Sequence, residues 1–324
     1  MVEKQLSKIA VLTSGGDGPG MNAAIRAVVR VALNQGVKVS GVQRGYEGLL
    51  NEEFFEMDHR SVSNIINRGG TILKTARSKE FATPEGKKKA VEILKKQGIN
   101  CLIVIGGDGS YRGACELFET FGFPTIGLPG TIDNDINGTD ETIGCHTAVN
   151  TALEAIDKIR DTAHSMERVF VIEVMGNRSG YIATEVALGA GAEEMIIPER
   201  KFDFEKMVGE IKEGYRIGKI SWMVVTAEGA GKADEIAKTI TNMTGLESRF
   251  VVLGHIQRGG TPTGRDRILA TRLGAAAVDC ALKGQFGKAI GVLRDEINII
   301  DLKEATHKEY KHLDEYQRLI GLLT

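Results

Sequence analysis

Two glycine-rich segments with acidic residues have the composition of a site for phosphate chemistry. They are Gly106-Gly107-Asp108-Gly109-Ser110 and Pro129-Gly130-Thr131-Ile132-Asp133-Asn134-Asp135. The N–H groups of a glycine turn bind anionic oxygens, and a carboxylate beside them holds Mg²⁺, which prefers oxygen ligands. We therefore predict that Asp108 binds Mg²⁺ and that Asp133 is the general base for a substrate hydroxyl. If the second segment is extended, Thr131, Asp133 and Asp135 point to one side.

Each segment also has a purely structural interpretation. Glycines allow tight turns, and Asx-rich stretches form turns through hydrogen bonds from side chain to backbone. Neither a Gly-x-Gly-x-x-Gly nor a Gly-x-x-x-x-Gly-Lys-Ser/Thr pattern follows a predicted strand. This disfavours the usual dinucleotide fold and a P-loop kinase. The two acidic segments together favour phosphoryl transfer, which depends on positioning, Mg²⁺ and neutralisation of charge.

A third segment, Gly254-His255-Ile256-Gln257-Arg258-Gly259-Gly260, follows the apolar run 250–253. Arg258 can bind a phosphate through two parallel N–H groups, and His255 can add a third donor. The alternatives are a structural histidine and a solvated arginine. Other candidate binding residues lie after glycines or at the ends of predicted strands. The alternative interpretation is that they are ordinary surface charges or core residues. They are Arg77, Arg168, Met175, Gly176, Glu228 and Arg249.

The elements that must position these residues follow an α/β rhythm. Short apolar runs end in glycine-rich turns and are followed by helical patterns. Strands alternating with helices predict mostly parallel sheets, whose ligands bind beyond the carboxyl ends of the strands. A helix at about 142–162 would carry the chain from one lobe to another. The predicted strands are 9–12, 101–105, 168–174, 222–226 and 289–293, and the first predicted helix is 21–35.

Composition limits the classes of function. The chain has 324 residues, 42% of them hydrophobic, with a net charge of −2 and one Trp. These values give no sign of nucleic-acid binding, and no run is long and apolar enough for a membrane helix. The four cysteines lack CxxC spacing and lie in contexts typical of buried thiols. We expect a cytoplasmic protein with no nucleic-acid or membrane partner.

These segments together resemble the ATP-dependent 6-phosphofructokinase family, from about Lys8 to Leu302. The resemblance rests on the run from Leu12 to Arg26, the turn 106–110, the segments 129–135 and 173–176, and the run 254–260. It implies an α/β fold of two lobes, each a mostly parallel sheet flanked by helices, with the active site in the cleft between them. The implied ATP lobe is 1–142 with about 256–304, and the implied fructose 6-phosphate lobe is 143–255 with about 305–324.

The resemblance also implies the reaction and the roles of residues. The γ-phosphoryl group of ATP goes to the 1-hydroxyl of fructose 6-phosphate in glycolysis, assisted by Mg²⁺ on Asp108. Asp133 is the implied base, with Thr131, Asp135 and Arg77 as catalytic partners. The bacterial pattern further implies allosteric control and a homotetramer whose subunits share active sites. The implied ATP contacts are Gly16, Arg77, Ser78, Gly107, Asp108, Gly109 and Ser110; the implied substrate contacts are Thr131, Ile132, Asp133, Arg168, Met175, Gly176, Asn177, Glu228, Arg249, His255, Ile256, Gln257 and Arg258.

Two glycines and several departures from the family's sequence pattern bear on the choice of phosphoryl donor and on regulation. Pyrophosphate-using relatives carry Asp at Gly109 and Lys at Gly130, so two open glycine positions favour ATP. Asn177 stands where bacterial members have Arg, which leaves a pyrophosphate-dependent or mixed-donor enzyme as an alternative. A weakly catalytic sugar-phosphate sensor and a nicotinamide-nucleotide or lipid kinase are further alternatives. The implied effector residues are Arg26, Arg30, Arg160, Glu193 and Lys219.

Overall fold

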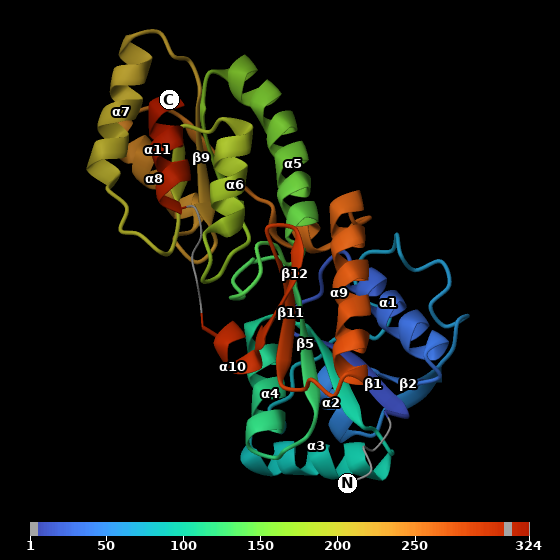
Figure 1. Cartoon of the computed structure of the whole chain (residues 1–324). Coiled ribbons are helices and arrows are strands. Elements are labelled where there is room, and N and C mark those ends of the chain that lie inside the picture. The colour runs from blue at the N-terminus through green and yellow to red at the C-terminus, as the bar shows by residue number, and fades with distance from the viewer. Residues whose placement is uncertain (1–5, 308–312, 324) are drawn as a thin grey trace. The chain divides into compact units, whose positions relative to one another are not determined.

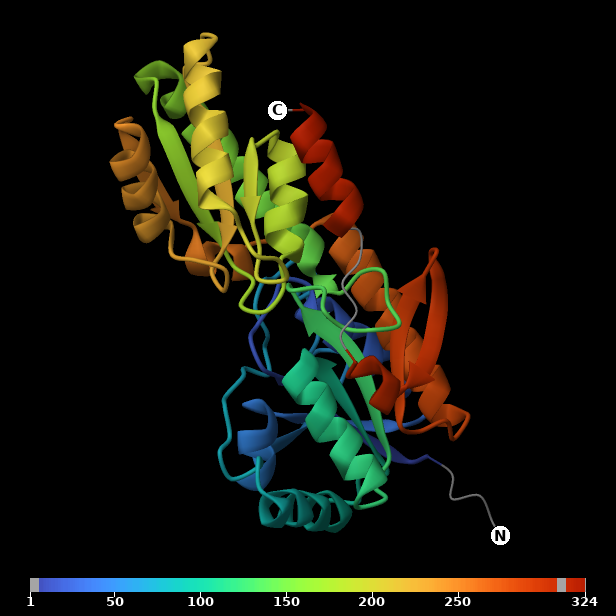
Figure 2. The same ribbon diagram turned by 90° about the vertical axis from the view of Figure 1, so that its left-hand side faces the viewer.

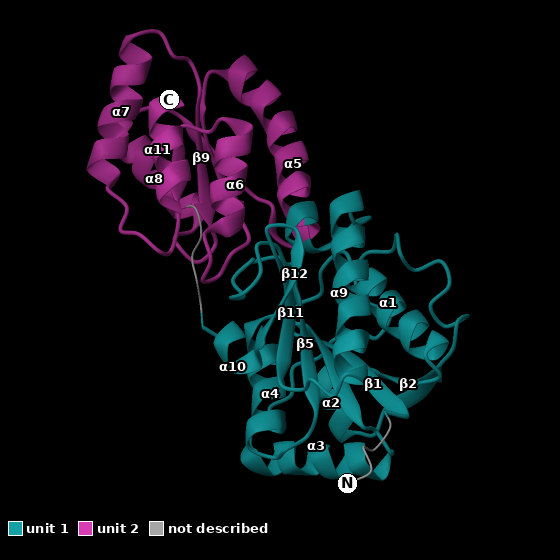
Figure 3. Cartoon of the chain, in the orientation of Figure 1, with its two compact units in different colours: residues 1–147, 258–309 teal, residues 148–257, 310–324 magenta. Residues whose placement is uncertain are grey.

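The computed structural model describes residues 6–307 and 313–323. The chain divides into two compact units (Figure 3). Unit 1 takes residues 1–147 and 258–309, and unit 2 takes residues 148–257 and 310–324. The first boundary falls inside helix α5 (Cys145–Met166), which is the helix predicted at about 142–162. The second falls inside the 3₁₀ helix η1 (Gly254–Arg258).

Unit 1 is built on an eight-stranded sheet (Figure 1). Seven strands lie in the order β12-β11-β5-β4-β1-β2-β3, and the short β6 pairs with β5. Pairing is parallel except between β11 and β12 and between β2 and β3, at the two edges. The strands are β1 (Lys8–Ser14), β2 (Lys38–Val42), β3 (Phe54–Met57), β4 (Cys101–Gly106), β5 (Thr125–Thr131), β6 (Ile143–Gly144), β11 (Lys288–Leu293) and β12 (Glu296–Asp301).

Helices cover both faces of this sheet (Figure 2). Side chains alternate between the faces of a strand, so in β1 Ile9 and Val11 join one apolar cluster, while Ala10 and Leu12 join the other. The first cluster includes α1 and α9, and the second includes α2, α3, α4 and α10. Burial on both faces explains the continuous apolar runs of the central strands. These helices are α1 (Met21–Asn34), α2 (Gly45–Leu50), α3 (Pro84–Lys96), α4 (Asp108–Glu119), α9 (Gly264–Leu282) and α10 (Leu302–Ala305).

Unit 2 has a four-stranded parallel sheet in the order β10-β7-β9-β8. Trp222 and Val224 of β9 pack with Met207 and Ile211 of α7 and with Ile236 and Ile240 of α8. Its strands are β7 (Val169–Val174), β8 (Glu194–Ile196), β9 (Trp222–Ala227) and β10 (Ser248–Val252), and its other helices are α6 (Tyr181–Ala190), α7 (Phe204–Arg216), α8 (Ala233–Thr244) and α11 (Leu313–Leu323).

The predicted α/β class with two mostly parallel sheets flanked by helices is confirmed. One local prediction is wrong: residues 131–135 are not extended. Strand β5 ends at Thr131, and Asn134 has a left-handed backbone with φ 47°. Asp133 and Asp135 therefore do not alternate along a strand with Thr131.

Three of the four cysteines are buried, as predicted, and one is not. None of the four forms a disulfide, and Cys101, Cys145 and Cys280 are buried, but Cys115 on α4 is only half-buried. Among the described residues, no helix has both the length and the apolar character that crossing a membrane requires.

Candidate active site

In unit 1, three loops that carry predicted site residues leave the carboxyl ends of adjacent strands. Parallel register sets Ser14 of β1 opposite Gly106 of β4, and Gly106 opposite Pro129 of β5. The turns after these strands therefore begin at the same edge of the sheet. A Cβ added at Gly107 would lie 3.3 Å from Cβ of Thr131, and one added at Gly15 would lie 3.4 Å from Oγ of Ser110. The three loops thus leave no room for a further side-chain atom without close contact at these positions.

Helix α4 begins directly in the second loop. Gly107 is its N-cap and Asp108 its first residue. The first N–H groups of a helix have no partner within it and carry the positive end of its dipole, so this turn can bind phosphate oxygens. Beside it, Thr131 Oγ1 accepts a hydrogen bond of 3.2 Å from the N–H of Asp133. That bond closes a turn at the end of β5 and fixes the backbone nitrogen of Asp133 relative to Thr131.

Arg258 and the segment 68–78 border the first loop of unit 1. Arg258 Nη1 donates to the carbonyl of Asp17 at 3.1 Å, and its guanidinium covers Gly16. Buried Asn22 donates to the carbonyls of Arg68 and Gly69 and accepts from the N–H of Ile72. The segment that carries Arg77 and Ser78 is thus fixed at its start, while Arg77 itself is exposed.

In unit 2, predicted sugar-binding residues also follow three adjacent strands, β10, β7 and β9. The N–H of Glu228, after β9, donates to the carbonyl of Val174 at 2.9 Å. The N–H of Met175, after β7, donates to Oε1 of buried Gln257 at 3.3 Å. Gly176 has φ 126°, and a Cβ there would meet the carbonyl of Ser179. Met175 is buried, Glu228 is half-buried, and His255 and Ile256 of η1 are exposed.

The two arginines predicted to reach a sugar phosphate share one carboxylate. Arg168 Nη2 lies 2.7 Å from Oε2 of Glu247, and Arg249 pairs with the other oxygen of Glu247. Arg168 stands just before β7 and Arg249 lies in β10, which are neighbours in the sheet. Glu247 therefore holds two cations side by side at the amino ends of β7 and β10, whereas Met175 and Glu228 follow the carboxyl ends of β7 and β9.

Comparisons with known proteins agree with these features. The family model described as phosphofructokinase matches residues 8–281. The chain belongs to the phosphofructokinase family. A protein of Clostridium tetani named ATP-dependent 6-phosphofructokinase is 56% identical over 306 residues, which cover 94% of this chain and 96% of that protein.

Solved phosphofructokinases share the fold. The phosphofructokinase of Saccharomyces cerevisiae is 38% identical with a TM-score of 0.85, covering 93% of this chain, which spans 45% of the yeast chain. The pyrophosphate-dependent phosphofructokinase of Marinobacter aquaeolei is 26% identical with a TM-score of 0.82, covering 96% of this chain and 86% of that one.

In this phosphofructokinase, only one of the two glycine positions expected to be open is open. Gly109 has open space around it, as predicted, but Gly130 does not. A Cβ at Gly130 would lie 2.8 Å from Cγ2 of Ile105 and 3.3 Å from the backbone nitrogen of Gly106. Close packing between β4 and β5 therefore excludes a larger side chain here unless the strands shift.

Asp108, the predicted magnesium ligand, is paired with Arg112. Its carboxylate oxygens accept from Nε and Nη2 of Arg112 at 3.0 and 2.7 Å. No group of three or more His, Cys, Asp or Glu side chains that could hold a metal occurs in the part of the chain described. Mg²⁺ at phosphoryl-transfer sites commonly takes one or two carboxylates and otherwise substrate phosphates and water, so a single Asp108 still fits that role.

The predicted effector residues are divided between the two units. Arg26 and Arg30 are half-buried on α1 of unit 1. In unit 2, Lys219 Nζ lies 3.0 Å from Glu193 and 4.4 Å from the ring centre of Trp222. Arg160 donates to the carbonyls of Ala190 and Gly191. These unit 2 cations already have acceptors in the chain itself.

Sequence reasoning missed three residues that hold the site. The pairing of Asp108 with Arg112 was detectable, because the two stand four residues apart at the start of a helix. Asn22 and Glu247 had no local signal, since Asn22 binds a segment about 50 residues away and Glu247 joins residues from two strands. Only the tertiary fold identifies such partners.

Proposed function

We propose that the chain is an ATP-dependent 6-phosphofructokinase, which transfers the γ-phosphoryl group of ATP to the 1-hydroxyl of fructose 6-phosphate in glycolysis. The products are fructose 1,6-bisphosphate and ADP. The observation that carries the proposal is the contact between the Gly107 turn at the start of α4 and Thr131, whose hydroxyl fixes the N–H of Asp133. A helix start, whose N–H groups can bind phosphate oxygens, and a carboxylate thus follow neighbouring strands, which supports the proposal. The relative from Clostridium tetani supports the same reaction.

Asp133 accepts the proton of the 1-hydroxyl as that oxygen forms a bond to the γ-phosphorus. The bond from the γ-phosphorus to the β,γ-bridging oxygen breaks, and its electron pair leaves with ADP. Thr131, Asp135 and Arg77 position the reacting groups. Asp108 would hold Mg²⁺, which would neutralise charge on the phosphate oxygens. The first N–H groups of α4, with Gly16, Ser78, Gly107, Gly109 and Ser110, bind ATP in unit 1.

The sugar phosphate binds through both charged and neutral groups. Arg168, Arg249, His255 and Arg258 surround the 6-phosphate, where guanidinium groups form paired hydrogen bonds. Glu247 holds the first two side by side at the amino ends of β7 and β10, away from His255 of the same chain, which supports their serving a neighbouring subunit. The sugar contacts are Ile132, Met175, Gly176, Asn177, Glu228, Ile256 and Gln257.

The proposal extends to assembly and location. The enzyme works in the cytoplasm as a homotetramer in which Arg168 and Arg249 serve the active site of a neighbouring subunit. The exposure of Arg249, whose side chain is 56% accessible in the single chain, supports this. Effectors bind through Arg26, Arg30, Arg160, Glu193 and Lys219.

The test is the rate of fructose 6-phosphate phosphorylation with Mg²⁺ and either ATP or pyrophosphate, for the wild type and for Asp133→Ser. We expect turnover with ATP, and a loss of kcat of about 10²- to 10⁴-fold in the variant with sugar-phosphate binding retained. Turnover with pyrophosphate alone would support the pyrophosphate-dependent alternative. Binding without turnover in the wild type would support the sensor.

A further inference from the structure

The loop that carries Asp133 packs against the core in its first part and borders a cavity at its far end. Residues 132–142 connect β5 to β6, and a cavity of about 400 Å³ is lined by Asp140 and Glu141 of this loop. Arg265 and Arg272 of α9 and Asp295 of the β11–β12 turn line it too. Ile132 and Ile136 are buried, and Ile136 joins the second apolar cluster of unit 1, so close packing fixes the first part of the loop. Asp140 and Glu141 border the cavity, so polar contacts set the position of this far part relative to Asp133.

Asn134 makes the contact that closes this loop. It follows Asp133 directly, adopts a left-handed backbone, and its Nδ2 donates to the carbonyl of Asp140 at 3.0 Å. Its Oδ1 is buried and accepts no hydrogen bond within the described part of the chain. A buried acceptor without a partner costs stability, so this side chain is not placed for stability alone.

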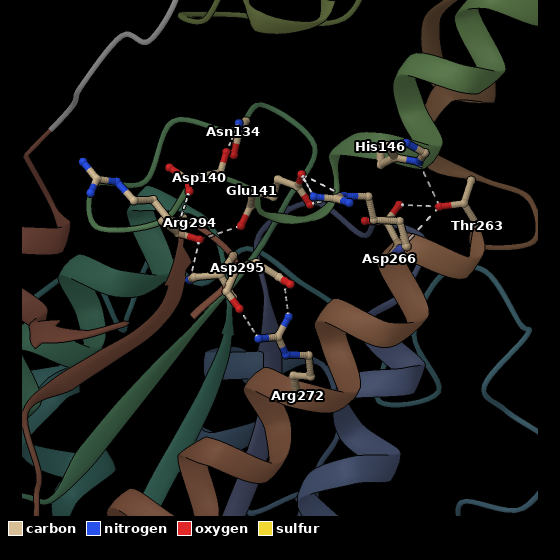
Figure 4. Close-up of polar contacts among 12 residues, drawn as sticks. Asn134, Asp140, Glu141, His146, Thr263, Asp266, Arg272, Arg294 and Asp295 are labelled. Carbon is tan, nitrogen blue, oxygen red and sulfur yellow. Dashed lines mark hydrogen bonds and ion pairs between the residues drawn. The ribbon is translucent and has the colours of Figure 1, made fainter. Parts of the chain in front are cut away.

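The far end of the loop is anchored to the β11–β12 hairpin and to α9 (Figure 4). The N–H of Asp140 donates to the carbonyl of Val292, and the N–H of Arg294 donates to Oδ2 of Asp140, each at 2.6 Å. Arg265 Nε lies 2.8 and 2.7 Å from the two carboxylate oxygens of Glu141. Asp140 and Glu141 are thus fixed by several hydrogen bonds and an ion pair. The Asn134 amide connects the residue next to Asp133 to this fixed part of the loop.

We infer that Asn134 is a positioning residue for phosphoryl transfer, which acts by tying the peptide next to Asp133 to the anchored carbonyl of Asp140. The inference depends on the proposed role of Asp133 as the base. A base that is displaced from the reacting hydroxyl lowers kcat steeply while substrates still bind. Asn134 does not touch substrate in this scheme.

The test is Asn134→Gly, because glycine adopts the left-handed backbone without strain and lacks the amide. We expect kcat to fall about ten-fold, with both KM values within about two-fold and a Tm close to that of the wild type. Asn64→Gly is the matched control, since Asn64 is exposed and also left-handed, with φ 54°. It should leave kcat unchanged.

A second variant tests the anchored end. Arg265→Gln removes the paired contacts to Glu141 and should lower kcat about three-fold, while Arg265→Lys, which keeps the charge, recovers part of the loss. An unchanged kcat in Asn134→Gly would overturn the inference, as would a fall in kcat matched by a large fall in Tm. Asp133→Ser is measured in parallel: if it keeps its kcat, the proposed function itself has failed.

Discussion

The candidate residues of unit 1 and those of unit 2 are held in different ways. In unit 1 the loops after β1, β4 and β5 are packed against one another, and glycines allow the close approach. In unit 2 the phosphate-binding candidates are long side chains, and Arg168 and Arg249 are held by ion pairs to Glu247. Backbone packing therefore positions the candidate residues of unit 1, and ion pairs position the candidate arginines of unit 2.

The contrast matches the two proposed tasks. Transfer of a phosphoryl group requires groups fixed within a fraction of an ångström, which packed backbone provides. Capture of an anionic sugar phosphate requires positive charge that a ligand can reach, which partly exposed arginines provide. We therefore expect unit 1 to be sensitive to added volume and unit 2 to be sensitive to charge, salt and pH.

The largest effect is expected from added volume in unit 1, at Gly106→Ala. A Cβ at Gly106 would meet the carbonyl of Ser14 and lie 2.5 Å from Oγ of Ser110, so two site loops must separate. We expect kcat to fall about 100-fold, since displacement of about 1 Å has that scale of effect, and stability to fall by about 1–3 kcal/mol. Steady-state kinetics and thermal unfolding measure both.

Gly209→Ala is the control for that prediction. Gly209 lies on an exposed position of α7 in unit 2, with no atom within 4 Å of an added Cβ. Alanine there should raise stability by up to about 1 kcal/mol through helix propensity and leave kcat unchanged. If Gly106→Ala behaved like Gly209→Ala, the claim that close packing positions the unit 1 loops would be wrong.

The sequence predicted the fold class because buried parallel strands and glycine turns produce strong local patterns. Strands such as β4 and β9, which are buried throughout, were located within one residue. The edge strands β3 and β12 were not predicted, since each has a mixed burial pattern that resembles a loop. Residues 131–135 were wrongly predicted as extended because a left-handed asparagine leaves no periodic signal.

For the candidate site, the sequence named chemical groups but not the contacts that hold them. Asp133 and Asp108 stand out by residue type and neighbours, and their roles stay predictions. The crowding around Gly130 was invisible, because it comes from Ile105 and Met21 on other elements. Glu247 was invisible for the same reason, as its partners come from neighbouring strands.

A moderate effect is expected from charge in unit 2, at Glu247→Gln. Glu247 neutralises one of the two positive charges of Arg168 and Arg249, so its loss should favour binding of the sugar phosphate. We expect KM for fructose 6-phosphate to fall up to about five-fold, as is typical for pairs of partly exposed charges, with kcat unchanged. The difference should shrink in high salt because salt screens the charges.

Glu213→Gln tests whether that effect is local. Glu213 also pairs with an arginine, Arg216, but on the exposed surface of α7. Its loss should leave KM for fructose 6-phosphate unchanged. A rise in KM for Glu247→Gln would show that the carboxylate organises the two arginines more than it neutralises them.

The smallest effect concerns stability and pH in unit 2. Burial raises the pKa of Glu194 on β8 from 4.5 to about 8. A hydrogen bond with Glu210 on α7 and the negative charge of Glu210 contribute to this rise. The charge of Glu193 raises the pKa further, whereas the charge of Lys206 lowers it. The folded state therefore holds this proton while the unfolded state loses it above about pH 4.5. Stability from this group is fully present below that pH and is lost as the pH rises through about 8.

Glu194→Gln removes that dependence, because a neutral amide resembles the protonated carboxyl group. The difference in Tm between variant and wild type should grow in favour of the variant from about pH 5 to about pH 8 and level off above that, by a few degrees at most. The contributions to Tm of the titrating groups that both proteins share cancel in this difference. A difference in Tm that stays constant over this range would mean that Glu194 is already ionised in the folded protein, and that charge in unit 2 has less influence than the comparison of the two units implies.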